Sequence, residues 1–141
     1  MMHFRLVSAQ GVKYDDEAYE VLVPTKAGTI AVFENHMPLI SAAAGGVVSV
    51  RPKASVRDAE MEHFAVSGGV MQVDGKELVF LSDDITASGE VNEKEAEAAL
   101  ARAEDLIKNA SSRTQLHEAH RLLHHSRAQL NVARLKRRHH N

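Results

Sequence analysis

The sequence contains no cysteine and no tryptophan, and aromatic residues make up only 4% of its 141 residues. The absence of cysteine excludes disulfide bonds, thiolate metal sites and cysteine nucleophiles, and it is compatible with a reducing, cytosolic location. No apolar run approaches the roughly 20 residues that span a bilayer, and the N-terminus lacks the pattern of a secretory signal. We therefore expect any membrane association to occur through a partner, without direct membrane insertion.

Neither sign of charge dominates, since the formal net charge is -2, but the charges are segregated along the chain. The acidic cluster consists of Glu90, Glu93, Glu95 and Glu97, and the basic cluster of Arg134, Lys136, Arg137 and Arg138. A basic end is typical of contact with nucleic acid, an anionic membrane surface or an acidic protein patch. It is equally typical of a solvated helix end whose cations complement the helix dipole.

Residues 1–87 are predicted to form an antiparallel β-sandwich. Short runs of β-branched and aromatic residues are separated by glycine-containing turns, which is typical of many short strands. The expected strands are 4–6, 20–23, 29–33, 47–50, 63–66, 70–73 and 78–81. The dipeptide Asp74-Gly75 lies between the last two and favours a type I′ hairpin, which requires positive φ angles at both residues.

Residues 88–141 are predicted to form an antiparallel α-helical hairpin, which makes the fold class α+β in two parts. Asn92 as N-cap with Glu95 three residues later predicts the first helix start, and Ser112 with Gln115 predicts the second. The two apolar stripes are Ala96, Ala99, Ala103, Leu106 and Ala110, and Leu116, Ala119, Leu123, Ser126, Leu130 and Ala133. Two helices that meet along alanine-rich stripes bury little apolar area between them, so we expect the hairpin to pack against another surface.

The sequence carries no recognisable catalytic pattern. The glycine pairs 45–46 and 68–69 lack the Lys-Ser/Thr of a phosphate-binding loop, and Ser67 lacks the glycine spacing of a serine hydrolase. Adjacent acidic residues such as Asp83 and Asp84 usually belong to a solvated loop and not to a catalytic site. We therefore expect no catalytic residues and no cofactor.

Histidine is abundant, with nine residues in the chain. His117, His120 and His124 share one face of the second predicted helix, and His125 adjoins them. Two imidazoles at this spacing can chelate a transition metal, but no carboxylate is placed to complete a site. We therefore expect a surface cluster that responds to pH and no metal site. His139 and His140 are expected to belong to a terminal tail.

Binding of single-stranded nucleic acid would require exposed aromatic side chains on which bases stack. The four phenylalanines, Phe4, Phe33, Phe64 and Phe80, all lie in predicted strands, where burial in the core is the usual arrangement. We therefore expect no nucleic-acid partner.

Two segments resemble signatures of the ε subunits of F-type ATP synthases. Residues 27–40 (AGTIAVFENHMPLI) resemble a Gly-acid-x-Gly-x-x-Pro-x-His-x-Pro-Leu run, and residues 64–73 resemble a strand, Ser-Gly-Gly turn and strand. The helical hairpin predicted at the end of the chain also agrees with this family, so the resemblance covers nearly the full length of the chain. The chain departs from the family pattern at three positions. Thr29 stands where the family usually has an acidic residue, Ala31 where it usually has glycine, and Glu34 where it usually has proline.

The resemblance implies a non-catalytic rotor subunit of the central stalk, which couples proton-driven rotation of the c-ring to ATP synthesis. Its partners would be the γ subunit, the c-ring and the catalytic alpha/beta head, and its hairpin would inhibit ATP hydrolysis by extending toward that head. The expected location is peripheral, on the cytoplasmic face of the energy-coupling membrane, here a bacterial plasma membrane.

The resemblance also assigns residues to these roles. The c-ring-facing loop would contain Thr29, Glu34, Asn35 and His36, and the inhibitory helix would contribute Arg121, Arg127, Arg134, Lys136, Arg137 and Arg138. Relatives that bind ATP carry arginines where this chain has Glu95, His125 and Gln129. Weak or absent nucleotide binding is therefore expected, because an anion would meet a carboxylate in place of a guanidinium.

Two other functions are compatible with the residues alone. The first is a β-sandwich adaptor whose basic hairpin binds an acidic protein or a nucleic acid. The second is an unrecognised enzyme, which is disfavoured because nucleophile, acid and metal-binding residues do not converge in the pattern.

Overall fold

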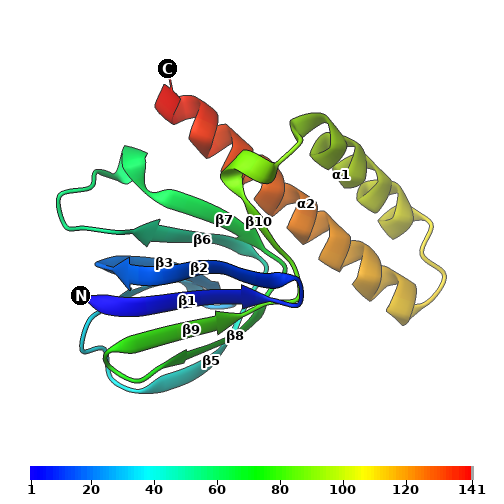
Figure 1. Cartoon of the computed structure of the whole chain (residues 1–141). Helices are drawn as coiled ribbons and strands as arrows, with labels where there is room; N and C mark the ends of the chain where they lie inside the picture. Colours follow the sequence, from blue (N-terminus) through cyan, green and yellow to red (C-terminus); the bar gives the residue numbers. More distant parts are fainter. Residues whose placement is uncertain (141) are drawn as a thin grey trace.

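The computed structural model describes the backbone of residues 1–140 and the side chains of residues 1–136, and it contains ten strands followed by two helices (Figure 1). The strands are β1 (Met2–Ser8), β2 (Gly11–Ala18), β3 (Glu20–Thr25), β4 (Gly28–Phe33), β5 (Leu39–Ala43), β6 (Gly46–Arg51), β7 (Glu62–Val66), β8 (Gly69–Val73), β9 (Glu77–Leu81) and β10 (Ile85–Ala87). The helices are α1 (Glu93–Lys108) and α2 (Arg113–His140), with short 3₁₀ turns at Asp58–Glu60 and Ser88–Glu90.

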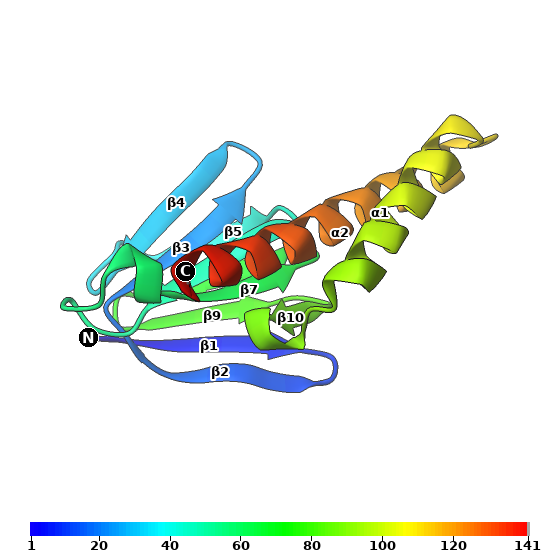
Figure 2. The same ribbon diagram turned by 90° about the horizontal axis from the view of Figure 1, so that it is seen from above.

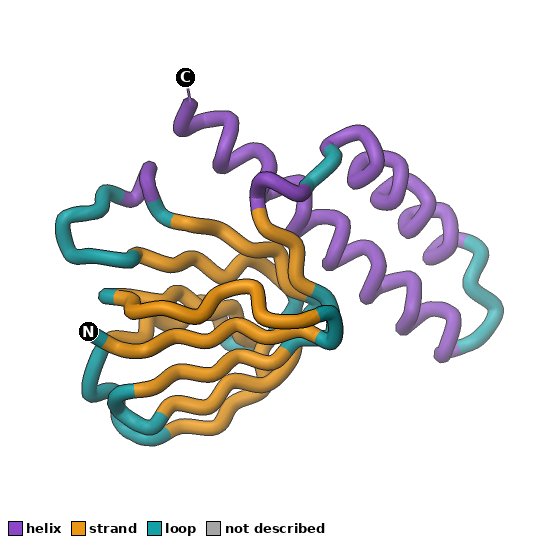
Figure 3. Tube along the Cα trace, viewed as in Figure 1, coloured by secondary structure: helices purple, strands orange, loops and turns teal. Residues whose placement is uncertain are grey.

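The strands form two five-stranded sheets. Sheet A has the order β2-β1-β9-β8-β5 and sheet B the order β10-β7-β6-β3-β4. All neighbours are antiparallel except β1 and β9, which run parallel. This arrangement confirms the predicted β-sandwich followed by a helical hairpin. The loops gather at the two ends of the sandwich, and the tip of the hairpin projects beyond one of these ends (Figure 3).

The core lies between the sheets and consists of one side of each strand. In β1 the burial alternates, so that Met2, Phe4 and Leu6 are fully buried while their neighbours face outward. The other large buried side chains include Val21, Val23, Val32, Val48, Val50, Val66, Met71, Leu78 and Phe80. All sixteen buried members of this core lie between Met2 and Ile85, so the sandwich holds its own core.

The seven predicted strands are present, but β2, β5 and β10 were missed. All three are edge strands. An edge strand has one hydrogen-bonded neighbour and needs no strong apolar alternation, and charges on it discourage pairing with another chain. β2 carries Asp15, Asp16 and Glu17, all exposed, which is why its sequence does not read as a strand.

The predicted type I′ turn is wrong, although the hairpin between β8 and β9 exists. Gly75 has a φ of 98°, but Asp74 does not have a positive φ, as the turn type would require. The Asp74 carboxylate instead accepts a hydrogen bond from the Glu77 amide at 3.0 Å, and the Asp74 amide donates to the Glu77 carbonyl at 3.1 Å. The turn is therefore longer than the two residues of a type I′ hairpin, and the Asp74 side chain caps it.

The helical hairpin begins as predicted, because the Asn92 side chain accepts a hydrogen bond from the Glu95 amide at 3.2 Å. Ala96, Ala103, Ala119, Leu123, Ser126 and Leu130 are buried as expected. Leu106 and Leu116, however, are 53% and 37% exposed. Both lie near the turn that joins the helices, and this tip points away from the sandwich (Figure 2), so no third layer covers them.

α2 buries a second stripe that the sequence pattern did not reveal. Ala128 and Val132 pack against Ala65 of β7, with Val47 and Val91 partly buried around them. Seen from above, α2 lies over sheet B (Figure 2). The hairpin therefore packs against the outer face of sheet B. This agrees with the expectation that two helices with little apolar area between them need a further surface to pack on.

Candidate docking surfaces and the hairpin contact

The residues expected to form one loop lie along one edge of the sandwich. Thr29 lies within β4, opposite Pro24 of β3, whereas Glu34, Asn35 and His36 follow the other end of the strand. At about 3.3 Å per residue, Thr29 and Glu34 are separated by roughly 16 Å. The expectation of a single loop is therefore wrong for Thr29. β4 is the outermost strand of sheet B, and we call this strand with residues 34–36 the β4 edge.

The far end of the β4 edge is held in place by backbone and charge contacts. The Glu34 carboxylate forms a 2.8 Å ion pair with the N-terminal amino group of Met1. The Asn35 amide, at a φ of 65°, donates to the Gly75 carbonyl at 2.6 Å. His36 Nδ1 lies 2.7 Å from the Met37 carbonyl oxygen. These contacts fix the loop against the β8–β9 turn, at the end of the sandwich opposite the hairpin (Figure 1).

An apolar row crosses the outer face of sheet A. Ala42, Val70, Leu81 and Val7 are successive neighbours on β5, β8, β9 and β1, and Val12 of β2 pairs with Val7. Val70, Leu81 and Val12 are 48%, 52% and 54% exposed. We call these five residues the sheet A row. A contiguous exposed apolar surface of this kind is typical of a protein interface.

Sequence reasoning missed the sheet A row, although a signal was present. Val70-Met71 and Phe80-Leu81 place apolar residues on both faces of their strands, whereas a strand with one solvated face should alternate. Met71 and Phe80 fill the core, so Val70 and Leu81 must face outward. Each apolar pair is therefore the sequence signal of a second apolar face, which the single chain leaves exposed.

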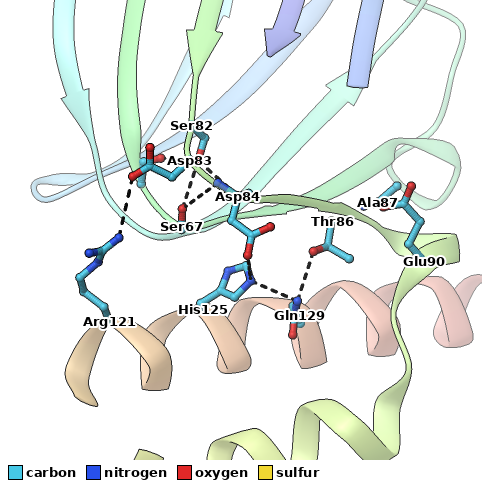
Figure 4. Close-up of polar contacts among 11 residues, drawn as sticks. Ser67, Ser82, Asp83, Asp84, Thr86, Ala87, Glu90, Arg121, His125 and Gln129 are labelled. Carbon is cyan, nitrogen blue, oxygen red and sulfur yellow. Dashed lines mark hydrogen bonds and ion pairs between the residues drawn. The ribbon is translucent and has the colours of Figure 1, made fainter. Parts of the chain in front are cut away.

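Polar contacts join α2 to β10 and to the segment that links β9 to β10 (Figure 4). His125 Nε2 lies 3.1 Å from Asp84 Oδ2, and Arg121 Nη2 lies 3.9 Å from Asp83 Oδ2. The Gln129 side-chain amide donates to Thr86 Oγ1 at 3.2 Å. The interpretation of Asp83 and Asp84 as a merely solvated loop is thus incomplete, because both carboxylates meet α2.

The structure separates His125 from the other histidines of α2. His117, His120 and His124 are exposed, and the rings of His120 and His124 stack with centroids 6.4 Å apart. The His125 side chain is only 14% exposed and points toward Asp84 (Figure 4). Among the side chains of residues 1–136, no group of three or more histidine or acidic residues is arranged to hold a metal ion. His139 and His140 lie outside the described side chains.

The basic residues assigned to the inhibitory helix are accessible where the structure describes them. Arg121, Arg127, Arg134 and Lys136 are exposed. The Lys136 ammonium approaches the turn at Gly89. The side chains of Arg137 and Arg138 lie outside the described residues. Of the described cations, Arg121 is paired with Asp83 and so contributes to the folded position of the hairpin.

A hollow lies between the start of α1 and the middle of α2. Its lining includes Glu90, Glu95, Arg102 and Gln129. Glu95 and Gln129 are two of the positions that the resemblance matches to arginines of ATP-binding relatives, and both line this hollow without a positive charge. The third, His125, is turned toward Asp84 instead. Weak or absent nucleotide binding stays a prediction.

The largest pKa change belongs to a residue of the sandwich. Burial raises the pKa of Tyr14 to about 12, and the nearby charges of Glu62 and Asp16 add to this effect. Burial, followed by the Asp16 charge, also raises the pKa of Glu62. The Tyr14 ring packs between Phe4 and Phe64, so these shifts reflect packing of the sandwich. None of the helices in the described part of the chain has the length and apolarity to cross a membrane.

Comparisons with known proteins agree on one family. Residues 1–88 match the family described as "ATP synthase, Delta/Epsilon chain, beta-sandwich domain". The ATP synthase epsilon chain of Gloeobacter violaceus is 30% identical over 132 residues, which cover 94% of this chain and 96% of the relative. That of Laribacter hongkongensis is 31% identical, covering 97% and 96%.

Solved structures share the fold. A chain in the mitochondrial ATP synthase of Euglena gracilis superimposes with a TM-score of 0.77 at 15% identity, covering 94% of this chain and 80% of that one. A chain from the central stalk and c-ring of the Tetrahymena thermophila enzyme gives a TM-score of 0.59 at 13% identity, covering 92% and 94%. At these identities the likeness concerns the fold.

Proposed function

This chain belongs to the family of ATP synthase epsilon chains, and on that premise we propose how its surfaces serve the central stalk. The chain is a non-catalytic rotor subunit and a peripheral part of a membrane-coupled enzyme. The partners are the γ subunit, the c-ring and the catalytic head. The adaptor alternative is not favoured, since relatives match nearly the whole length.

The sheet A row is proposed to bind the γ subunit. A contact that must persist through rotation needs an apolar centre that is shielded from water, and the row is the contiguous exposed apolar surface on this sheet. The hairpin packs on sheet B, so the row is accessible while the hairpin is folded. This exposed row is the observation that carries the proposal.

The β4 edge is proposed to face the c-ring, with Thr29 near one end and Glu34, Asn35 and His36 at the other. The edge lies at the side of the sandwich, between the outer faces of the two sheets. A sandwich that docks its sheet A face on the γ subunit can therefore rest this edge on the ring. The contact would involve the length of β4 and not a single loop.

The hairpin is proposed to act as a brake on ATP hydrolysis when it extends toward the catalytic head. Its exposed cations, such as Arg127 and Arg134, suit an acidic surface. We place the complex on the cytoplasmic face of a bacterial plasma membrane. Bacterial relatives at 30–31% identity support this placement over chloroplast relatives at 24–26%.

Docking by the sandwich alone is tested with a chain that ends at Ser88. Because its core is complete without the hairpin, the truncated chain is expected to fold and to co-purify with the γ subunit and the c-ring. Leu81→Arg in the full chain should weaken γ binding by about 30-fold or more, the size expected for a central apolar anchor. Ala101→Arg, on the exposed side of α1, is the matched control and should bind normally. A folded Ser88 truncation that fails to assemble would contradict the proposal.

The orientation of the β4 edge is tested by cysteine crosslinking, which the absence of native cysteine simplifies. Thr29→Cys and His36→Cys are each expected to crosslink to a cysteine in the exposed loop of the c subunit, because both ends of the edge face the ring. Arg57→Cys, in an exposed loop before β7, is the control and should not react. Crosslinking at one end alone would restrict the ring contact to that end.

A further inference from the structure

Four strands lie at the edges of the two sheets, and three of them carry a feature that hinders pairing with a further strand. β2 has a run of acidic residues at 15–17, whose charges discourage pairing with another chain. β10 is only three residues long, and the Gln129 side-chain amide of α2 donates to Thr86 beside it. β5 continues into Ala44, whose amide donates to the Pro24 carbonyl of β3 at 3.0 Å, so the other sheet closes the end of this edge.

β4 is the fourth edge strand and has no such feature. Its residues, from Gly28 to Phe33, include no charge and no proline, and its pairing with β3 is free of bulges. The helix α2 contacts β6 and β7, and Figure 2 shows β4 at the margin of the sandwich, away from the hairpin. An extended, uncharged edge of this kind is suited to pairing with an added strand.

The register of β4 on β3 shows which backbone groups face the open side. Pro24 lies opposite Thr29 and has no N–H, and its carbonyl is turned to the Ala44 amide. Thr29 therefore belongs to a non-hydrogen-bonded pair, and because pairs alternate along an antiparallel ladder, so does Ala31. The N–H and C=O groups of Thr29 and Ala31 consequently point away from β3, where sheet B has no further strand in the described part of the chain.

The sequence of β4 is complementary to a second copy of itself. When two copies run antiparallel with Ala31 opposite Ala31, the small methyl groups meet at the two-fold axis and Thr29 lies opposite Phe33, a β-branched and aromatic pair that stabilises sheets. Lys26 precedes the strand and Glu34 follows it, and both are exposed. Antiparallel pairing brings the lysine of each copy near the glutamate of the other, whereas two copies of β2 would bring acidic residues together.

We propose that the unassembled chain forms a two-fold dimer in which β4 of one copy pairs antiparallel with β4 of the other, centred on Ala31. The two copies of sheet B then form one continuous sheet. The rings of Tyr19 and Phe33, with centroids 5.6 Å apart, are 40% and 41% exposed at the end of the strand and gain cover from the other copy. One strand edge buries less than the roughly 1,200–2,000 Å² of stable complexes, so the dimer is weak, with a dissociation constant of about 100 μM.

The consequence for assembly rests on the proposed function, in which the β4 edge faces the c-ring. The dimer and the ring contact would use the same edge and would therefore exclude each other. The dimer would cover an edge that is prone to aggregation until the chain joins the enzyme.

Sedimentation velocity on the isolated full-length chain tests the dimer. Between about 10 μM and about 500 μM the unchanged chain should shift from monomer to dimer, as expected for a weak interface. Ala31→Lys and Ala31→Glu each place like charges at the two-fold axis and should weaken the dimer by about tenfold or more. An equimolar mixture of the two variants should recover it, because opposite charges then meet at the axis. Ala31 is exposed, so both variants should fold, which circular dichroism checks.

Leu81→Arg is the control, since it changes the sheet A row and should dimerise like the unchanged chain. The proposal is overturned if the unchanged chain stays monomeric over the whole range, or if the dimer survives in both Ala31 variants. Loss of the dimer in Leu81→Arg would place the contact on sheet A, and a mixture that stays monomeric would exclude pairing centred on Ala31. A monomeric chain would leave the proposed ring contact standing, because cysteine crosslinking tests that contact separately, and failed crosslinking would leave the dimer standing.

Discussion

Replacing Gly69 with alanine is expected to destabilise the sandwich severely, whereas the same change at Gly11 should destabilise it far less. A Cβ at Gly69 would lie 1.9 Å from the Leu81 carbonyl oxygen and 2.9 Å from its carbon. These are backbone atoms of β9, which pairs with both β1 and β8 and cannot move without breaking sheet A. Gly69 also has a φ of +151°, a backbone conformation that residues with a side chain rarely adopt.

Gly11 is the matched control because it has a φ of +135° but no atom within 4 Å of a built Cβ. Its change to alanine imposes backbone strain alone, about 1–3 kcal/mol. Gly69→Ala adds the steric overlap and should exceed about 4 kcal/mol, a large part of the 5–15 kcal/mol typical of a whole domain. Urea unfolding followed by circular dichroism compares the two variants. Similar midpoints for both would show that β9 can relax around the new methyl group.

Removing the helical hairpin is expected to accelerate ATP hydrolysis by the assembled enzyme several-fold. The comparison uses the full chain, a chain ending at Ser88, and a variant with Arg127, Arg134 and Arg137 changed to alanine. Exposed ion pairs contribute about 0–1 kcal/mol each, so three pairs at about 0.5 kcal/mol each would together account for roughly tenfold in rate. The triple variant should approach the truncated chain at low salt.

Two controls separate inhibition by the hairpin from a general effect of charge: a change of ionic strength, and the removal of an arginine from the sandwich. The unchanged enzyme should lose inhibition as ionic strength rises, because a Debye length of about 10 Å at 0.1 M screens exposed pairs. Arg57→Ala removes a 79% exposed arginine on the sandwich and should not change the rate. Equal hydrolysis rates for all three forms at low salt would make the hairpin a passive part of the rotor.

The candidate sites were only partly visible in the sequence. The signature around His36 and Pro38 pointed to the β4 edge, but it could not show that Thr29 and Glu34 lie near opposite ends of a strand. The cations of α2 are exposed where their side chains are described, and their inhibitory role stays a prediction. The sheet A row was missed, because neighbours such as Val70 and Leu81 become adjacent only when β8 pairs with β9 in its observed register.

The sequence by itself determined the two-part architecture, the Asn92 cap and the family. These features depend on residues close in the chain: strand-like runs between turns, apolar spacings of three and four, and a side chain that caps the amide three residues ahead. Tertiary structure alone decided that α2 has a second buried stripe at Ala128 and Val132 and that His125 meets Asp84. Such contacts join segments far apart in the chain, so they depend on sheet order and on the face of sheet B that the hairpin covers, which no local pattern encodes.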